Sequence, residues 1–157
     1  MNKSNSLVIF TLDNQRYALH LHAVRRVARI VAITPLPNAP DCILGVIDFH
    51  GQLLPVINVR LRFGLPERAI GAIVLTDQLL IAHTARRPVA LVVESVLDVI
   101  ENTAEKLFAA DNILPRMAYV EGVLKLPDGL ILIHDLDTFL SLEEESALDQ
   151  ALALESS

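Results

Sequence analysis

The stretch GVIDFHGQLLPVINVR, from Gly45 to Arg60, carries the pattern that decides the fold. Two apolar arms flank a His-Gly-Gln turn, and β-branched residues are frequent in both arms. Short apolar segments on either side of a glycine-containing turn are typical of a β-hairpin. Asp48 and His50 share one face of the expected hairpin, because alternate residues of a strand point the same way. They are therefore either members of a functional site or ordinary surface residues.

Similar short segments recur along the rest of the chain. They are rich in β-branched residues and are separated by polar or Gly/Pro breaks, a spacing that predicts a small barrel or sandwich. The segments are Leu7 to Asp13, Arg16 to Leu21, Ala72 to Thr76, Leu79 to Thr84 and Val89 to Val96. The prolines between Thr34 and Pro40 exclude a central strand there, because each proline lacks the donor that a strand ladder needs.

A weak internal repeat relates the first hairpin to a later segment. At an offset of 77 residues, Gly45 to Val59 aligns with GVLKLPDGLILIHDL, Gly122 to Leu136. The apolar positions are largely kept, whereas Lys125 stands at the position of Asp48. The repeat predicts two similar sub-barrels of around 70 residues, each of which needs its neighbour to complete a core. It also indicates that the hairpin is a structural unit whose polar residues are interchangeable.

Helical signals are few and lie toward the C-terminus. Ser141 with Glu144 predicts a capping box for an acidic, amphipathic helix over residues 141–154. The acidic run from Glu143 to Glu145 is expected to be a solvated helix start that complements the helix dipole. Asn102 with Glu105 predicts a second, short helix. We expect a single domain over residues 1–157, with residues 1–5 flexible.

Composition argues against several classes of partner. The net charge of −6 and the aromatic content of 4% argue against nucleic-acid binding, because such binding requires clustered cations and aromatic side chains on which bases stack. No apolar run approaches the roughly 18 residues that span a bilayer, so direct membrane insertion is not expected. The single cysteine, Cys42, forms no internal disulfide and suits a cytoplasmic location. We interpret Cys42 as a small buried apolar residue.

Catalytic and cofactor signatures are missing from the sequence. The six glycines form neither a dinucleotide-binding fingerprint nor a phosphate-binding loop, and no serine lies in a G-x-S-x-G elbow. We therefore expect no catalytic residue and no cofactor. An alternative is a metal-dependent enzyme, because His20 and His22 share a strand face and form half of a metal site. Its further ligands would come from Asp48, His50 and His134, although His134 is expected simply to end a strand.

Three segments together resemble the CheW family of chemotaxis adaptors. They are Val24 to Gly64, with its TPLPNAP loop and its G-V-I-x-x-x-G-x-x-L-P-V-I hairpin, VALVVESVLDVI (Val89 to Ile100), and YVEGVLKLPDGLILIHDLDTFL (Tyr119 to Leu140). The resemblance implies a mainly β fold of two intertwined SH3-like five-stranded β-barrel subdomains packed together, with short helices and a C-terminal helix. It also implies that the chain has no enzymatic activity.

The implied partners are a CheA-type histidine kinase and the cytoplasmic tip of a chemoreceptor. By resemblance, a receptor groove is expected near six apolar residues, of which the last two come from the second barrel: Val27, Ile30, Ile43, Val46, Val92 and Val96. A specificity face, whose charges select the partner, is expected at Arg26, Asn38, Asp48 and His50.

The chain departs from the family pattern at this specificity face. Members commonly carry an acidic residue where this chain has Arg26, and an N-L-R-G turn where it reads Asp48-Phe49-His50-Gly51. An acid and an arginine would attract each other, whereas Arg26 and a protonated His50 repel. The departure leaves open the alternative that the chain is a divergent CheW-like module that binds a different protein partner.

Overall fold

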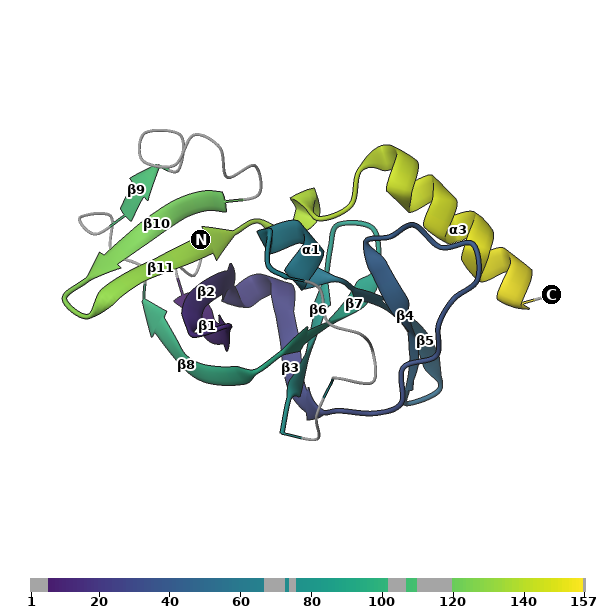
Figure 1. Cartoon of the computed structure of the whole chain (residues 1–157), viewed down its shortest axis with the longest axis horizontal. Coiled ribbons are helices and arrows are strands. Elements are labelled where there is room, and N and C mark those ends of the chain that lie inside the picture. Colours follow the sequence, from purple (N-terminus) through teal and green to yellow (C-terminus); the bar gives the residue numbers. More distant parts are fainter. Residues whose placement is uncertain (1–5, 67–72, 74–75, 102–106, 110–119, 157) are drawn as a thin grey trace.

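The computed structural model describes residues 6–66, 73, 76–101, 107–109 and 120–156. Within these residues the chain forms two β-sheets and a C-terminal helix, arranged along an elongated molecule (Figure 1). The expected short helix after Asn102, residues 1–5 and most of the expected strand from Ala72 to Thr76 lie outside the described residues.

One sheet combines strands from both ends of the chain. Its order is β8-β1-β2-β11-β10-β9, and β2 pairs in parallel with β11. The strands are β1 (Ser6–Leu12), β2 (Gln15–His20), β8 (Ser95–Glu101), β9 (Leu107–Ala109), β10 (Val120–Leu126) and β11 (Gly129–His134). The N-terminal hairpin thus lies beside the C-terminal hairpin, on the left in Figure 1.

The other sheet is built from the middle of the chain, in the order β3-β6-β7-β5-β4. Its strands are β3 (Val24–Arg29), β4 (Ile43–Phe49), β5 (Gln52–Ile57), β6 (Gln78–His83) and β7 (Pro88–Val93). The outer strands β3 and β4 are not joined by a ladder. Instead Thr34, in the proline-rich loop, exchanges two backbone hydrogen bonds with Val46, of 2.9 and 2.8 Å. The mainly β, two-subdomain architecture is confirmed; among the described residues the first sheet has six strands rather than five, and neither barrel is fully closed.

The internal repeat corresponds to a repeated structure. The strands β10 and β11 have the bounds of β4 and β5 displaced by 77 residues. Even the irregularity recurs, since the register shifts between Ile43 and Gly45 in one hairpin and between Val120 and Gly122 in the other. The second strand of each hairpin then pairs in parallel with a strand from elsewhere, β5 with β7 and β11 with β2.

The expected strand from Val89 to Val96 is in fact two strands in different sheets. The chain leaves β7 and enters β8 at Glu94, whose N–H donates to the carbonyl of Thr11 at 3.0 Å. The carboxylate of Glu94 accepts a hydrogen bond from the N–H of Asp13 at 3.1 Å. The prediction of one strand is wrong because the sequence stays rich in apolar, β-branched residues through the point where the chain changes sheets.

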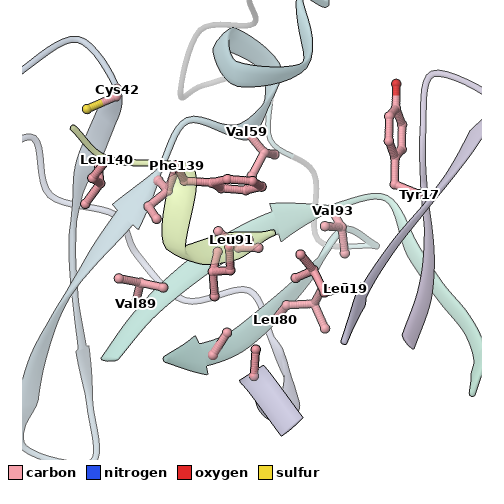
Figure 2. Close-up of a cluster of buried hydrophobic side chains, with 14 of the residues drawn as sticks. Tyr17, Leu19, Cys42, Val59, Leu80, Val89, Leu91, Val93, Phe139 and Leu140 are labelled. Carbon is pink, nitrogen blue, oxygen red and sulfur yellow. The ribbon is translucent and has the colours of Figure 1, made fainter. Parts of the chain in front are cut away.

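A central core joins the two sheets. Strands β6 and β7 are apolar on both faces: Leu80 and Leu91 face the central cluster, while Leu79 and Val92 face the interior of the five-stranded sheet. Figure 2 shows Leu19 from β2 close to Leu80 and Leu91 within this cluster. Side chains from both sheets are therefore needed to cover the same core.

The C-terminal helix packs against this core. It is α3 (Leu142–Ser156), and its Leu148 and Ala151 are buried in the central cluster. The shorter helices are α1 (Val59–Phe63) and the 3-10 turns η1 (Leu21–Ala23) and η4 (Leu136–Thr138). None of the helices in the described part of the chain is long and apolar enough to cross a membrane.

The predicted capping box at the start of α3 is confirmed. The N–H of Glu144 donates to Ser141 Oγ at 3.1 Å, and the N–H of Ser141 donates to the Glu144 carboxylate at 2.8 Å. The expectation that the acidic run is solvated is wrong for Glu144 and Glu145. Glu144 pairs with Arg62, and Glu145, only 5% exposed, accepts a hydrogen bond from Arg87 at 2.8 Å. Arginines from the body of the protein draw these carboxylates inward.

Replacing Gly45 with alanine should destabilise the fold. A Cβ at this position would lie 2.3 Å from the carbonyl oxygen of Thr34, where the proline-rich loop bridges to β4. Because the obstacle is backbone, we expect a loss of about 2 to 3 kcal/mol in the free energy of unfolding. Urea denaturation measures it, with Gln52→Ala on the exposed start of β5 as the control. Equal stability of the two variants would contradict the close approach.

Stability should depend on pH through Glu144. Partial burial opposes its ionisation, but hydrogen bonds from Arg62 and from the backbone of Ser141 outweigh it and lower the pKa of Glu144. The resulting stabilisation is full above the pKa of an unfolded glutamate, about 4.3, and is lost as pH falls through the lower folded pKa. Glu144→Gln should therefore lower the free energy of unfolding by about 1 kcal/mol at neutral pH and leave it unchanged below the pKa of Glu144 in the folded protein.

The matched control for this prediction is Glu143→Gln, because Glu143 is exposed on the same turn of α3. Denaturation of both variants and of the unaltered protein across the acidic range gives the comparison. A destabilisation by Glu144→Gln that stays constant with pH would contradict the role of its charge.

Candidate partner-binding site

The two sheets meet at a junction between β6 and β8. The side-chain oxygen of Gln78 accepts a hydrogen bond from the backbone N–H of Val96 at 2.7 Å. Gln78 also lies opposite Arg29 in the ladder between β6 and β3. The end of β3 therefore lies close to the start of β8.

A groove of about 500 Å³ opens at this junction. It is lined by Val27, Ala28, Arg29, Ile30, Thr76, Asp77 and Gln78. Val27 is 41% exposed, and on β8 the side chains of Leu97 and Val99 are 53% and 49% exposed. Apolar side chains that stay exposed on outer strands near a groove are typical of a protein-interaction surface.

The six residues expected at the receptor groove divide into two groups. Val27 and Ile30 line the groove, and Val96 lies half-buried at the junction. The other three are buried, with exposed fractions of 8% for Ile43, 8% for Val46 and 5% for Val92. They pack beneath the surface rather than offering side chains to a partner.

The expected origin of these residues needs one correction. Val92 lies in β7, in the same sheet as Val27, whereas Val96 lies in β8 of the other sheet. The expectation that both come from the second barrel is wrong for Val92, because the chain changes sheets between them. The exposed Leu97 and Val99 were missed, since alternation along a strand does not tell which strand is an outer one.

All four residues of the expected specificity face are exposed. The guanidinium of Arg26 lies 5.7 Å from the centre of the Phe49 ring, and the His50 ring contacts the same ring edge-on at 4.3 Å. Arg26 and His50 thus share one aromatic neighbour across the gap between β3 and β4. Asn38 lies in the proline-rich loop, with a left-handed φ of 68°.

Asp48 has a structural role in the hairpin turn. His50 and Gly51 have φ values of 53° and 84°, and the Asp48 carboxylate accepts a hydrogen bond from the N–H of Gly51 at 2.9 Å. Positive φ at both central residues is the geometry of the two-residue turn that fits the twist of a hairpin. Asp48 therefore fixes how His50 is presented.

A charged contact joins the two sheets away from the groove. Arg60, in α1, donates two hydrogen bonds to the carboxylate of Asp13, in the turn after β1, at 3.0 and 2.7 Å. Its third guanidinium nitrogen donates to the carbonyl of Pro66 at 2.7 Å. A two-pronged pair of this kind fixes the orientation of the groups that it joins.

The histidines do not assemble the metal centre of the alternative hypothesis. The rings of His20 and His22 stack with centres 5.4 Å apart, and His20 Nε2 lies 2.7 Å from the Glu121 carboxylate. His134, the last residue of β11, is buried with its ring centre 4.0 Å from that of Phe63. Across the described residues, no three His, Cys, Asp or Glu side chains are placed to hold a metal ion.

Cys42 is fully buried in the central core, as expected. Burial and the neighbouring Glu144 raise the pKa of its thiol to about 11. The thiol is therefore protonated at neutral pH, whereas nucleophilic cysteines act as thiolates.

Comparison with known proteins agrees with this geometry. The family model described as CheW-like domain matches residues 6–144. The chemotaxis protein CheW of Klebsiella aerogenes is 28% identical over 144 residues, which cover 90% of this chain and 85% of that protein. The chemotaxis protein CheW of Bacillus subtilis is 28% identical over 151 residues, which cover 92% and 94%.

A solved structure has the same fold. The crystal structure of the scaffolding protein TtCheW from Thermoanaerobacter tengcongensis superposes with a TM-score of 0.77 at 26% identity, over 92% of each chain. The match of the family model over nearly the whole chain, together with these relatives, shows that the chain belongs to the CheW-like family of non-catalytic chemotaxis scaffolds.

Proposed function

We propose that this chain couples the cytoplasmic tips of chemoreceptors to a CheA-type histidine kinase, in chemotaxis or a related motility pathway. The observation that carries the proposal is the groove at the sheet junction, which the exposed Val27 lines and which Gln78 links to β8 with its exposed Leu97 and Val99. The resemblance to the CheW family implies that the receptor partner is helical. A helix that places an apolar stripe in a groove is a recurrent mode of protein recognition. The protein would act in the cytoplasm, where such tips lie.

The receptor would contact the groove through its accessible apolar side chains. Val27 and Ile30 line it, and Val96 joins it to the exposed residues of β8. The buried Ile43, Val46 and Val92 would keep the surface in shape from below. When a partner covers an exposed apolar side chain, the free energy of binding becomes more favourable by about 25 cal/mol per Å² of apolar surface removed from water.

The kinase would contact the specificity face formed by Arg26, Asn38, Asp48 and His50. Arg26 and Val27 are consecutive residues of β3, so their side chains point to opposite sides of the strand. The register supports this, because Val27 pairs with Leu80 of the central core and Arg26 with Ile81 of the other cluster. A receptor and a kinase can therefore occupy the two sides at the same time.

A different protein partner is the second candidate for the specificity face. The cationic Arg26 and the titratable His50 both contact Phe49, and the described residues contain no ion pair of Arg26. A face of this composition favours an acidic partner surface. The partner would then be a protein whose contact surface is more acidic than that of the kinases bound by other family members.

The coupling function is tested by co-sedimentation of the purified chain with a receptor tip fragment and a CheA-type kinase from the same genome. We expect the chain to bind each partner alone and all three proteins to form one complex. Binding to the receptor without the kinase would favour the second candidate. A folded sample that binds neither protein would overturn the proposal.

Two substitutions should separate the two contacts. Val27→Asp places a charge in the groove and should weaken receptor binding by at least tenfold, because a charge desolvated in an apolar interface is costly. Arg26→Glu reverses the charge that the kinase of the same genome would have to complement, so it should weaken kinase binding by a similar factor while receptor binding is retained. Titration calorimetry with each partner measures both effects.

The control for this pair is Leu154→Asp, because Leu154 is 62% exposed near the end of α3. It should leave both affinities unchanged. A loss of both partners with either Val27→Asp or Arg26→Glu would contradict the division into two sides.

A further inference from the structure

We infer that the helix that enters the junction groove carries acidic residues along the flank that meets β3. The inference rests on the proposed function, because it specifies the chemistry of the partner of the same groove. It is carried by the placement of two accessible arginines, Arg25 and Arg29, at the outer strand that forms one side of the groove.

Strand β3 bears a concentration of positive charge on an acidic protein. Its sequence is VRRVAR, and all three arginines are exposed, whereas the net charge of the whole chain is −6. Arg26 lies over the Phe49 ring on the other side of the strand. Within the residues that the structure describes, Arg25 and Arg29 form no ion pair, although six other pairs join arginine or histidine to carboxylates.

Arg29 is placed beside the apolar surface of the groove. It lines the groove together with Val27, and the two residues share a face because they are two positions apart in the strand. Asp77 also lines the groove, but it is only 5% exposed. The accessible charge next to the exposed Val27 side chain is therefore that of Arg29.

Arg25 extends the positive charge along the same strand. The register between β3 and β6 shifts between Val24 and Arg26, so Arg25 lies at a bulge and its side chain is exposed. On the β8 side the exposed charges are the acidic Asp98 and Glu101. Among the described residues, the exposed positive charges that could attract acidic residues of a bound helix thus lie on the β3 side alone. A helix with basic residues facing β3 would be repelled.

Charge of this kind acts mainly on specificity and association rate. Exposed ion pairs are individually weak, so removal of one arginine should reduce affinity by only about two- to fivefold. Reversal of both charges adds repulsion and should reduce it by about tenfold or more, with an effect that shrinks as salt is raised.

The test uses a displayed library of amphipathic helices. Each helix has a fixed apolar stripe with the spacing i, i+3, i+4 and i+7, and its flanking positions vary among Glu, Gln and Lys. The library is selected on the unaltered protein and on the double variant Arg25→Glu/Arg29→Glu. We expect Glu to be enriched on one flank by the unaltered protein and Lys to be enriched on that flank by the double variant.

The matched control is Arg86→Glu, which reverses an exposed arginine in the turn between β6 and β7. It should select the same helices as the unaltered protein. Any of three outcomes would overturn the inference: the double variant selects the same flank as the unaltered protein, no flank preference is found, or no helix is selected. The inference would also be overturned if no helix were selected and the protein bound phosphatidylglycerol vesicles only with both arginines present. Arg25 and Arg29 would then bind a membrane surface.

These outcomes are distinct from failure of the proposed function. If receptor and kinase co-sediment with the chain but no acidic flank is selected, only the present inference is lost. If acidic-flank helices are selected through Arg25 and Arg29 but receptor and kinase do not bind, the groove takes such a helix from another protein.

Discussion

The burial of β6 and β7 on both faces is the constraint on which the rest of the structure depends. One face contributes Leu80 and Leu91 to the core shared by the two sheets, and the other contributes Leu79 and Val92 to the interior of their own sheet. Neither face can be left in water without exposing a row of large apolar side chains. The two sheets therefore behave as one folding unit, and the groove between them keeps a fixed shape.

This arrangement explains why the proposed binding surfaces lie at the margins. Strands β6 and β7 have no free face, so the side chains proposed to meet partners lie on the outer strands β3 and β8 and in turns. Strand β3 shows the result, since Val27 turns to the junction groove while Arg26 turns to Phe49. One outer strand thus presents side chains on two sides, as the proposed coupling of two partners would require.

Local features were predictable from the sequence because local geometry fixes them. The repeat from Gly45 and from Gly122 predicted two hairpins, and the structure adds the shared bulge. The capping box at Ser141 followed from residue types at a fixed spacing. The repeat also predicted two sub-barrels that need each other to complete a core, and the family resemblance implied the same architecture.

Features that depend on long-range neighbours were not predictable in the same way. Alternation shows which residues share a face, but it does not show which sheet a strand joins, so the crossing at Glu94 was missed. Ile43 and Val46 were expected at a surface because apolar residues look alike whether a partner or the core covers them. Glu145 was expected in water because its partner, Arg87, lies far away in the sequence.

The parallel pairing of β2 with β11 has a consequence for how the protein is made. The side chain of Gln15 bonds to the carbonyl of Leu130, 115 residues later, so the first hairpin emerges from the ribosome long before its neighbour exists. The strands of the middle sheet, β3 to β7, follow one another along the chain, so all of them leave the ribosome before β11 does. The first strands must wait for the last, and closing so long a loop is slow. During translation β2 thus lacks its parallel neighbour until the last hairpin has been made.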